Sequence, residues 1–147
     1  MEYLIKPHEG FLIKNKNMFI TLGTQKEIIH KQLDSNPSYI METLEYYDEL
    51  RVDYNENDEA VAFEFFSNAD VFLDSTYSPK ITEKNLFKIS FSELNELLIK
   101  IDPQSKVSGA GVISLNYGLG TYLEDAEDDR CESIIIFKKG YYDSLGW

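Results

Sequence analysis

Residues 50–66, LRVDYNENDEAVAFEFF, decide the fold of this 147-residue chain. Apolar side chains occupy every second position on either side of a polar stretch at 55–59: Leu50, Val52, Tyr54, Val61, Phe63 and Phe65. Alternation with a period of two places one set of side chains on one face of a strand, and a short polar stretch between two strands is typical of a turn. The stretch therefore predicts an antiparallel hairpin with an acidic tip.

A second hairpin is expected near the C-terminus. Ile113, Leu115 and Tyr117 alternate with other residue types, and we expect the chain to continue extended through Leu123. The acidic stretch 124–129 then predicts a turn. Residues 133–137, Ser-Ile-Ile-Ile-Phe, are too uniformly apolar for a strand with one solvated face, so they predict a strand that is buried on both faces.

A helix start signal precedes each hairpin. Residues 24–27 (Thr-Gln-Lys-Glu) and 90–93 (Ser-Phe-Ser-Glu) both have the capping-box form, in which a hydroxyl and a later carboxylate satisfy free backbone N–H groups. Apolar residues then recur at helical spacing, and each run ends before a proline. These patterns predict helices over 24–35 and 91–101.

The repeated order of elements indicates a duplication. We expect a single domain, 1–147, with pseudo-repeats at about 1–74 and 75–147. The predicted fold class is α+β, in which two duplicated helix–antiparallel-sheet halves have their helices packed on one sheet face. Residues 70–74 predict a further strand between the halves. A pseudo-symmetric arrangement would allow both acidic tips to share one rim.

Two windows hold all of the excess negative charge. Residues 42–74 carry eleven acids and one base, and residues 124–132 carry six acids and one base, in a chain whose formal net charge is −12. Such a concentration of negative charge repels nucleic acid and anionic lipid, and it attracts and steers a basic partner. We therefore expect a protein that binds a basic protein, and neither nucleic acid nor membranes.

The composition also indicates the cellular compartment of the protein. The single cysteine, Cys131, excludes an intramolecular disulfide and with it a secreted disulfide scaffold. The first residues lack the charged and apolar regions of a signal peptide, and no run of about 18 apolar residues is present to span a membrane. The expected compartment is the cytoplasm.

Residues 20–28, Ile-Thr-Leu-Gly-Thr-Gln-Lys-Glu-Ile, with Leu33 and Asn36-Pro37 further on, form a pattern known from bacterial proteins. They resemble the "I-x-L-G-[MT]-T-x-x-E-V … L-G-x-P" opening of small helix-plus-sheet modules, which occur in outer-membrane assembly lipoproteins and, in tandem, in the β-lactamase inhibitor protein. The chain differs at Asp34-Ser35, where the modules have a second glycine, and it lacks the lipobox cysteine of the lipoproteins. The resemblance implies a helix across an antiparallel sheet and a precedent for protein inhibition through a concave sheet face.

A calcium loop is the nearest match to a metal-binding motif. Asp53, Asn55 and Asn57, with Glu64 at the twelfth position, supply oxygen ligands at the expected spacing. The sixth position holds Asp58 where the sharp turn needs glycine, and the flanks alternate as strands. We therefore favour an acidic hairpin turn over a calcium site.

The remaining reactive side chains show no catalytic arrangement. His8, His30 and Cys131 lack the spacing of metal ligands or of a nucleophile and its base. We expect no enzyme, no metal site and no cofactor, and an enzyme or a calcium-binding module ranks last among the alternatives.

The expected partner-binding residues are acids and tyrosines of the two charged windows: Glu45, Tyr46, Tyr47, Asp48, Glu56, Asp58, Glu59, Glu124, Asp125, Glu127, Asp128 and Asp129. Tyrosines are frequent interface anchors, and carboxylates can stand against the Lys and Arg of a partner. In size and charge the chain is also similar to the small acidic immunity proteins that bacteria keep beside secreted toxins.

These patterns predict a non-catalytic protein that inhibits a basic partner by occlusion. The leading interpretation is a cytoplasmic immunity protein of a bacterial toxin, such as a nuclease. The alternative is an acidic adaptor or a nucleic-acid mimic that binds a DNA-binding protein.

Overall fold

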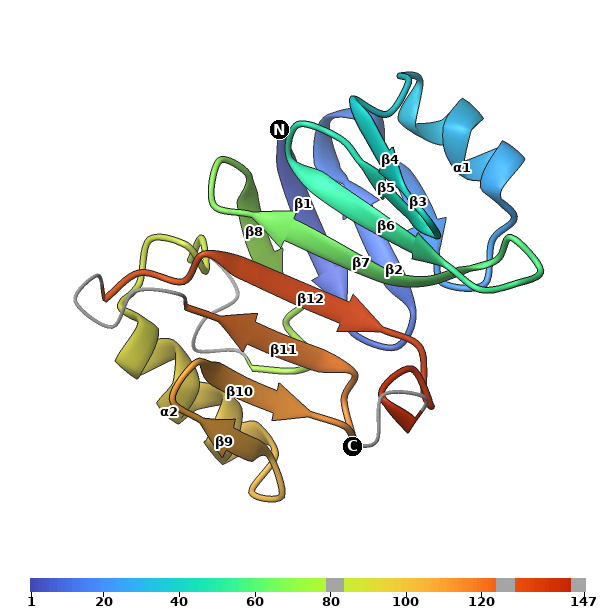
Figure 1. Cartoon of the computed structure of the whole chain (residues 1–147). Coiled ribbons are helices and arrows are strands. Elements are labelled where there is room, and N and C mark those ends of the chain that lie inside the picture. Colours follow the sequence, from blue (N-terminus) through green and yellow to red (C-terminus); the bar gives the residue numbers. More distant parts are fainter. Residues whose placement is uncertain (79–83, 124–128, 144–147) are drawn as a thin grey trace.

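The computed structural model of the chain describes residues 1–78, 84–123 and 129–143. These residues form an α+β fold with two sheets (Figure 1). One sheet has four strands in the order β3-β2-β1-β8, and the other has eight in the order β4-β5-β6-β7-β12-β11-β10-β9. The predicted α+β class is confirmed.

The small sheet is built mainly from the N-terminus. It contains β1 (Glu2–Lys6), β2 (Gly10–Ile13), β3 (Met18–Thr21) and β8 (Asp70–Leu73), and a short 3-10 helix, Lys14–Lys16, joins β2 to β3. β1 pairs antiparallel with β2 and parallel with β8. The prediction of a strand at 70–74 is confirmed, whereas the three N-terminal strands were not predicted from the sequence.

The large sheet consists of two antiparallel meanders, each preceded by a helix. The first comprises α1 (Lys26–Leu33), β4 (Tyr39–Met41), β5 (Leu44–Tyr46), β6 (Leu50–Tyr54) and β7 (Ala60–Phe66). The second comprises α2 (Phe91–Ile101), β9 (Lys106–Ser108), β10 (Gly111–Ser114), β11 (Leu119–Tyr122) and β12 (Ser133–Phe137). The last strands of the two meanders, β7 and β12, pair antiparallel. The hairpin at 50–66 and the fully buried strand at 133–137 are thereby confirmed.

The core lies between the two sheets. The large sheet turns one face toward it, here called the inner face, with Leu50, Val52, Phe63, Phe65, Ile134 and Ile136. Phe11 of the small sheet packs edge-on against Phe63 and Phe65, with ring centroids 4.9 and 5.0 Å apart. Each ring is fully buried. Large aromatic side chains from non-adjacent segments therefore hold the sheets together.

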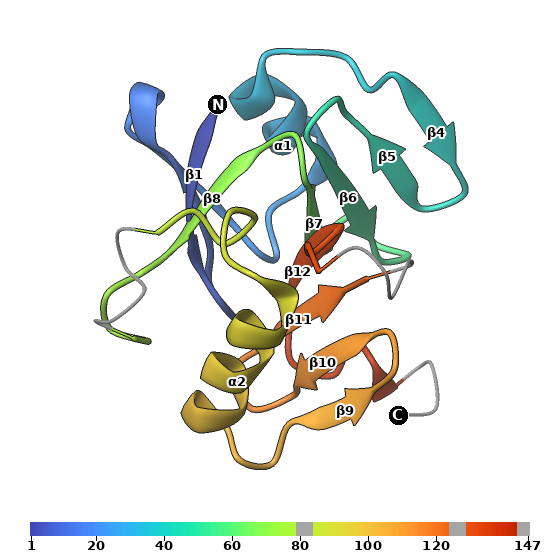
Figure 2. The same cartoon turned by 90° about the vertical axis from the view of Figure 1, so that its left-hand side faces the viewer.

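The two helices do not clearly form the expected layer on one sheet face. α2 lies beside β10 and β11, where the Thr121 hydroxyl donates to Asn95 at 2.9 Å and the Ser114 hydroxyl donates to Asp102 at 2.6 Å (Figure 2). α1 lies beside β3. The small sheet, rather than a second helix, covers the inner face at β6 and β7. The apolar side chains of the small sheet pack there against the apolar side chains of β6 and β7.

The two predicted capping boxes behave differently. Ser90 is the N-cap of α2, and its hydroxyl accepts a hydrogen bond from the Glu93 N–H at 3.1 Å, as predicted. The N-cap of α1 is Gln25 rather than Thr24, and no side chain caps it. The hairpin tip replaces the cap, because the N–H of Lys26 donates to the carbonyl of Asp58. The prediction of a capping box at Thr24 was therefore wrong.

The chain reverses after β10, where an extended segment was expected. Gly118 has a φ of +69°, and its N–H donates to the carbonyl of Ser114 at 2.9 Å. The side chain of Ser114 accepts the N–H of Tyr117 at 3.1 Å. These local bonds close a turn between β10 and β11, so Leu115 and Tyr117 do not continue the strand.

The two acidic stretches leave the large sheet at opposite ends. Near the tip at 55–59, Ala62 of β7 pairs with Phe137, the last residue of β12. At the other end of β7, Phe66 pairs with Ser133, which also pairs with Tyr122, just before the second acidic stretch. The antiparallel pairing of β7 and β12 causes this, because it places the start of one strand beside the end of the other. The described strand ends that flank the two stretches therefore lie at different rims of the sheet, and residues 124–128 themselves lie outside the described part of the chain.

Candidate functional site

The outer face of the large sheet, opposite the inner face, presents a row of residues that crosses all eight strands. Residues that stand opposite each other in antiparallel strands point to the same face. The register thus aligns Tyr39, Tyr46, Arg51, Glu64, Ile135, Gly120, Ile113 and Lys106. Aromatic and charged residues occupy the end of the row that lies toward β4.

One half of the outer face is covered by the segment after β12. Phe137 packs against Tyr142 with ring centroids 4.8 Å apart, and Ile135 belongs to the same cluster. The Tyr141 hydroxyl donates to Asp53 at 2.8 Å, and burial together with the Asp53 charge raises the pKa of Tyr141 above its ordinary value. This part of the face is closed by the chain itself.

The other half of the outer face carries three aromatic rings in succession, which we call the aromatic ladder: Tyr39, Tyr46 and Phe66. The ring of Tyr46 lies 5.6 Å from that of Tyr39 and is stacked on that of Phe66 at 6.5 Å. Tyr39, on the terminal strand, is 58% exposed. The ladder thus runs from β7 to the free edge of the sheet.

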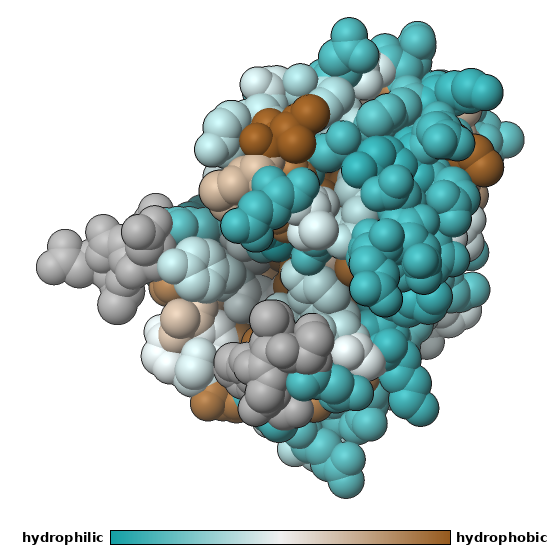
Figure 3. Space-filling model, turned by 45° about the vertical axis from the view of Figure 1, so that its right-hand side comes forward, coloured by the Kyte–Doolittle hydropathy of each residue, from teal (hydrophilic) through white to brown (hydrophobic). Residues whose placement is uncertain are grey.

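The molecular surface is mixed in polarity on the side that Figure 3 shows. On the face shown in Figure 3, strongly apolar side chains form separate spots among hydrophilic and pale ones, rather than one broad patch. Non-obligate protein interfaces have this composition, with aromatic anchors inside a polar surround. The aromatic ladder supplies side chains of the kind that anchor such interfaces.

An ion pair stands in the middle of the row. Nη2 of Arg51 lies 3.3 Å from Oε2 of Glu64, and both side chains are partly buried. Burial raises the pKa of Glu64 and Arg51 lowers it, with a net rise. Burial lowers the pKa of Arg51, whereas Glu64, Tyr46 and Tyr141 raise it, with a net rise. The aromatic ladder and the charged pair are thus electrostatically coupled.

Most acids of the first charged window are bound within the chain. Eight of the eleven make a side-chain hydrogen bond or an ion pair: Glu45, Glu49, Asp53, Asp58, Glu59, Glu64, Asp70 and Asp74. Within the described part of the chain, only Glu42, Asp48 and Glu56 lack such a partner. The window therefore does not form one continuous acidic face.

The predicted residues at 45–48 lie on both sides of the sheet. Tyr46 belongs to the aromatic ladder, and the Asp48 side chain is exposed. Glu45 is only 4% exposed, and its carboxylate lies 2.7 Å from Nε2 of His30. Tyr47 is buried, and burial beside Glu45 raises its pKa. Glu45 and Tyr47 are therefore poorly placed to touch a partner.

The predicted acids of the hairpin tip are partly engaged. Asp58 lies 3.2 Å from Nζ of Lys26, and Glu59 accepts from the side chain of Asn55 at 3.0 Å. Glu56 is exposed. The tip is thus fastened to α1 by Asp58, and Glu56 is its one acid with no partner among the described residues.

The second charged window is described only at its end. Asp129 accepts hydrogen bonds from the N–H and the hydroxyl of Ser92, at 3.2 and 3.1 Å, in the first turn of α2. Glu124, Asp125, Glu127 and Asp128 lie outside the described residues. Asp129 therefore contacts the helix start, where a negative charge is favoured.

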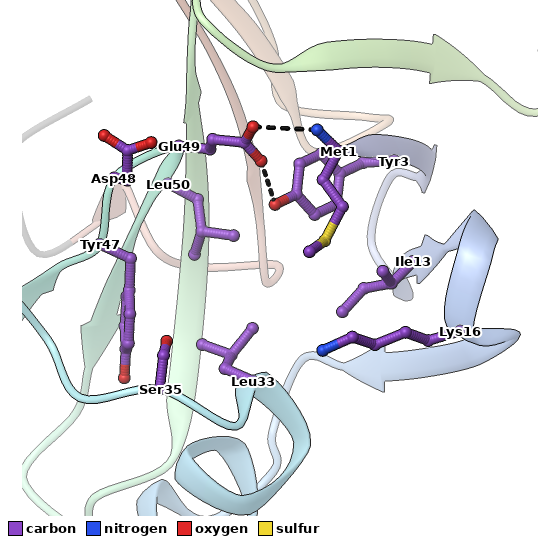
Figure 4. A pocket seen from close by; sticks show the side chains of 10 residues that line it. All are labelled: Met1, Tyr3, Ile13, Lys16, Leu33, Ser35, Tyr47, Asp48, Glu49 and Leu50. Carbon is purple, nitrogen blue, oxygen red and sulfur yellow. Dashed lines mark hydrogen bonds and ion pairs between the residues drawn. The ribbon is translucent and has the colours of Figure 1, made fainter.

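A cleft of about 300 Å³ opens between the end of the small sheet, the end of α1 and the turn before β6 (Figure 4). Tyr47 and Asp48 line it. The carboxylate of Glu49 closes one wall, accepting from the Tyr3 hydroxyl at 2.6 Å and the Met1 amino group at 3.0 Å. The side chain of Lys16 points into the opening from the other side. Its charge disfavours a basic side chain there, so the cleft is a weaker candidate than the ladder.

The calcium-loop ligands are held in other interactions. Asp53 accepts from Thr43 at 2.8 Å, Glu64 pairs with Arg51, and Asn55 accepts the N–H groups of Asn57 and Glu59. Over residues 1–78, 84–123 and 129–143, no group of three or more His, Cys, Asp or Glu side chains is placed to hold a metal ion. In the same ranges, no helix is long and apolar enough to cross a membrane.

Comparison with known proteins gave no match for this chain, neither among family models, nor among curated proteins, nor among solved structures. The surface must therefore be interpreted from its own residues.

Sequence reasoning missed three surface residues of the large sheet: Tyr39, Met41 and Phe66. Tyr39 and Met41 stand in a short apolar run after Pro37, and that run was the available signal for an edge strand. Phe66 ends the apolar run of the second strand in the predicted hairpin, and the structure shows it partly buried on the outer face. Its neighbour Phe65 faces the core.

Proposed function

We propose that this chain is a non-catalytic binding protein that inhibits a basic protein by covering its functional surface. A cytoplasmic immunity protein acting on a bacterial toxin, such as a nuclease, fits this role. The observation that carries the proposal is the aromatic ladder, which reaches the free sheet edge in a chain of net charge −12. Tyrosine anchors would supply affinity, and the charge would select and steer the partner.

The internal use of the acids favours this role over nucleic-acid mimicry. A mimic needs carboxylates that stand free and in succession, as phosphates do, whereas most carboxylates of residues 42–74 are bonded within the chain. Among the residues that the structure describes, the side chains of Glu42 and Asp48 have no partner; Glu42 lies in the turn between β4 and β5, and Asp48 lies after β5. They are placed to flank a partner on the ladder.

We also propose that the two halves of the chain arose by duplication, as in the tandem modules that the sequence resembles. Both halves have the order helix followed by a four-stranded meander, and β7 and β12 occupy equivalent central places. Superposing α1 to β7 on α2 to β12 tests this: matched strand order with mismatched register or helix position would count against it.

The proposed function is tested with the basic domains encoded by neighbouring reading frames. Each is expressed with and without the chain, and growth and binding are measured. We expect one such domain to be toxic alone and harmless with the chain, and Tyr46→Ala to raise its dissociation rate by at least about tenfold. Tyr122→Ala, an exposed tyrosine on the same face outside the ladder, is the matched control.

Protection that survives Tyr46→Ala unchanged, or that falls equally with Tyr122→Ala, would contradict the role of the ladder. If no basic protein binds the chain, the proposed function itself fails. Thermal unfolding of each variant separates a lost contact from a lost fold.

A further inference from the structure

The outer edge of β4 is a strand edge that no charged side chain of that strand protects. β4 ends the large sheet, and none of the described strands lies along its other side; in Figure 2 it is the outermost element at the upper right. Ile40 and Met41 are 59% and 44% exposed, and Tyr39 is exposed as well. Such an edge offers unpaired backbone groups to another strand, and proteins usually protect it by keeping the strand very short or with Lys, Pro or a bulge. β4 contains no Lys or Pro.

The opposite edge of the sheet provides a comparison. β9 is equally short, and its central residue, Val107, is 65% exposed. It differs in carrying Lys106, a side chain that typically discourages strand addition. One edge of the sheet is therefore protected by charge, and the other is not.

The charge around β4 indicates which kind of strand it suits. Residues 32–50, which include β4 and β5, contain five acids and no Lys or Arg. Glu42 follows β4 directly and has no side-chain partner among the described residues. A cationic segment would be attracted to this edge, whereas a second copy of the chain would bring two acidic edges together.

The aromatic ladder adds a contact for a cation. Tyr39 is the last ring of the ladder and stands on β4 itself. A strand added beside β4 would place alternate side chains next to Tyr39 on the outer face, and Lys or Arg interacts favourably with the face of an aromatic ring. The same strand would place its other side chains next to Ile40 on the inner face.

We infer that the free edge of β4 binds an extended, basic segment of the partner as an additional strand of the sheet. Main-chain hydrogen bonds give affinity in this mode, and the alternating side chains give specificity. The inference rests on the proposed function and names the contact through which it acts. It specifies a segment with Lys or Arg on the side of Tyr39 and apolar residues on the side of Ile40.

The probe is the capped peptide Thr-Lys-Val-Arg-Val-Lys-Thr, titrated into the ¹⁵N-labelled full chain. We expect chemical-shift changes centred on residues 38–42 and slowed amide exchange in β4. The same peptide with N-methyl groups on its pairing edge should bind at least about tenfold more weakly, because it cannot complete the ladder of hydrogen bonds. A version with Glu in place of Lys and Arg should not bind.

Ile40→Lys and Val107→Lys form a matched pair, since both introduce a lysine at the centre of a terminal strand. Ile40→Lys should weaken peptide binding at least about tenfold, and Val107→Lys should leave it unchanged. Equal effects of the two variants, or equal binding of the N-methylated peptide, would overturn the inference. A dimer of the free chain that Ile40→Lys dissociates would assign the edge to a second copy and overturn it too.

The two proposals fail in different ways. A basic partner that binds through Tyr46 but is indifferent to Ile40→Lys leaves the proposed function standing and removes strand addition. If no basic protein binds at all, the proposed function fails, whatever the peptide does.

Discussion

Arg51 and Glu64 face each other across β6 and β7, with Nη2 of Arg51 3.3 Å from Oε2 of Glu64. The pair lies between the aromatic ladder and the part of the outer face that Tyr141 and Tyr142, after β12, cover. Burial disfavours the charged form of Glu64 and raises its pKa, and the positive charge of Arg51 stabilises that charged form. The pair therefore links the stability of the sheet to pH.

Arg51→Met should destabilise the chain by about 2 kcal/mol at pH 7, because it leaves a partly buried carboxylate without its cation. Without Arg51 the pKa of Glu64 rises further. A carboxyl group whose folded-state pKa is raised favours folding below its unfolded pKa and loses that contribution as pH rises through the folded pKa. The difference in unfolding free energy between wild type and Arg51→Met should therefore be smaller at pH 4 than at pH 7.

Urea unfolding of both proteins at each pH measures this difference. The double variant Arg51→Met/Glu64→Leu is the control, and it should recover most of the stability at pH 7, because neither charge is then buried. An equal loss at pH 4 and pH 7 would show that packing of the Arg51 stem, rather than the charge, is what matters.

Ser90→Ala should lower the free energy of unfolding more than Thr24→Ala, although both residues begin a capping-box sequence. Ser90 caps α2 through the N–H of Glu93, so its replacement should cost about 1 kcal/mol. Thr24 lies outside the helix and caps nothing, so Thr24→Ala should cost less than about 0.5 kcal/mol. Thermal or urea unfolding checks both, and equal losses would mean that Thr24 supports α1 in another way.

This contrast shows where sequence patterns suffice and where they fail. The cap of Ser90, the hairpin at 50–66 and the buried strand β12 depend on residues close together in the chain, and they were predicted. The start of α1 depends on the tip at 55–59, which reaches the helix only in the folded state. Local patterns cannot show that a distant carbonyl will satisfy a helix N–H group.

The residues of the candidate site also divide into those that local sequence patterns indicate and those that depend on distant contacts. Tyr46 was predicted as a partner-binding residue because aromatic residues among acids are frequent in interfaces, and it lies, partly buried, in the aromatic ladder. Glu45 and Tyr47 stand on the other face of the same strand region, which follows from alternation once the strand is known. The pairing of Glu45 with His30 joins β5 to α1, so the sequence alone could not reveal it.

Cys131 should be unreactive in the folded chain. Burial raises the pKa of its thiol to about 11, and the side chain is almost fully covered. Since the thiolate is the reactive form, its reaction with a chromogenic disulfide at pH 8 should be at least about 100-fold slower in the native chain than in urea. Glutathione in the same two buffers provides the control, and similar native and unfolded rates would mean that the segment 129–133 opens readily.

The free acids should govern the rate at which a basic partner binds. Reversing the charge of Glu42, Asp48 and Glu56 together should slow association and leave the fold intact, since these side chains have no partners within the described residues. Reversing Asp58 and Glu59 changes the net charge in the same direction, but it also breaks the contacts to Lys26 and Asn55. Only this second variant should lower the unfolding temperature.

Stopped-flow association with the partner at increasing salt separates steering from direct contact. Screening shortens the reach of charge from about 10 Å at 0.1 M to about 3 Å at 1 M, so wild-type association should slow steeply while dissociation changes little. The triple reversal should reduce that salt dependence, because the charges responsible for it are gone. Should the association rate ignore both salt and these reversals, the net charge of −12 would not act in recognition, and the ladder alone would have to select the partner.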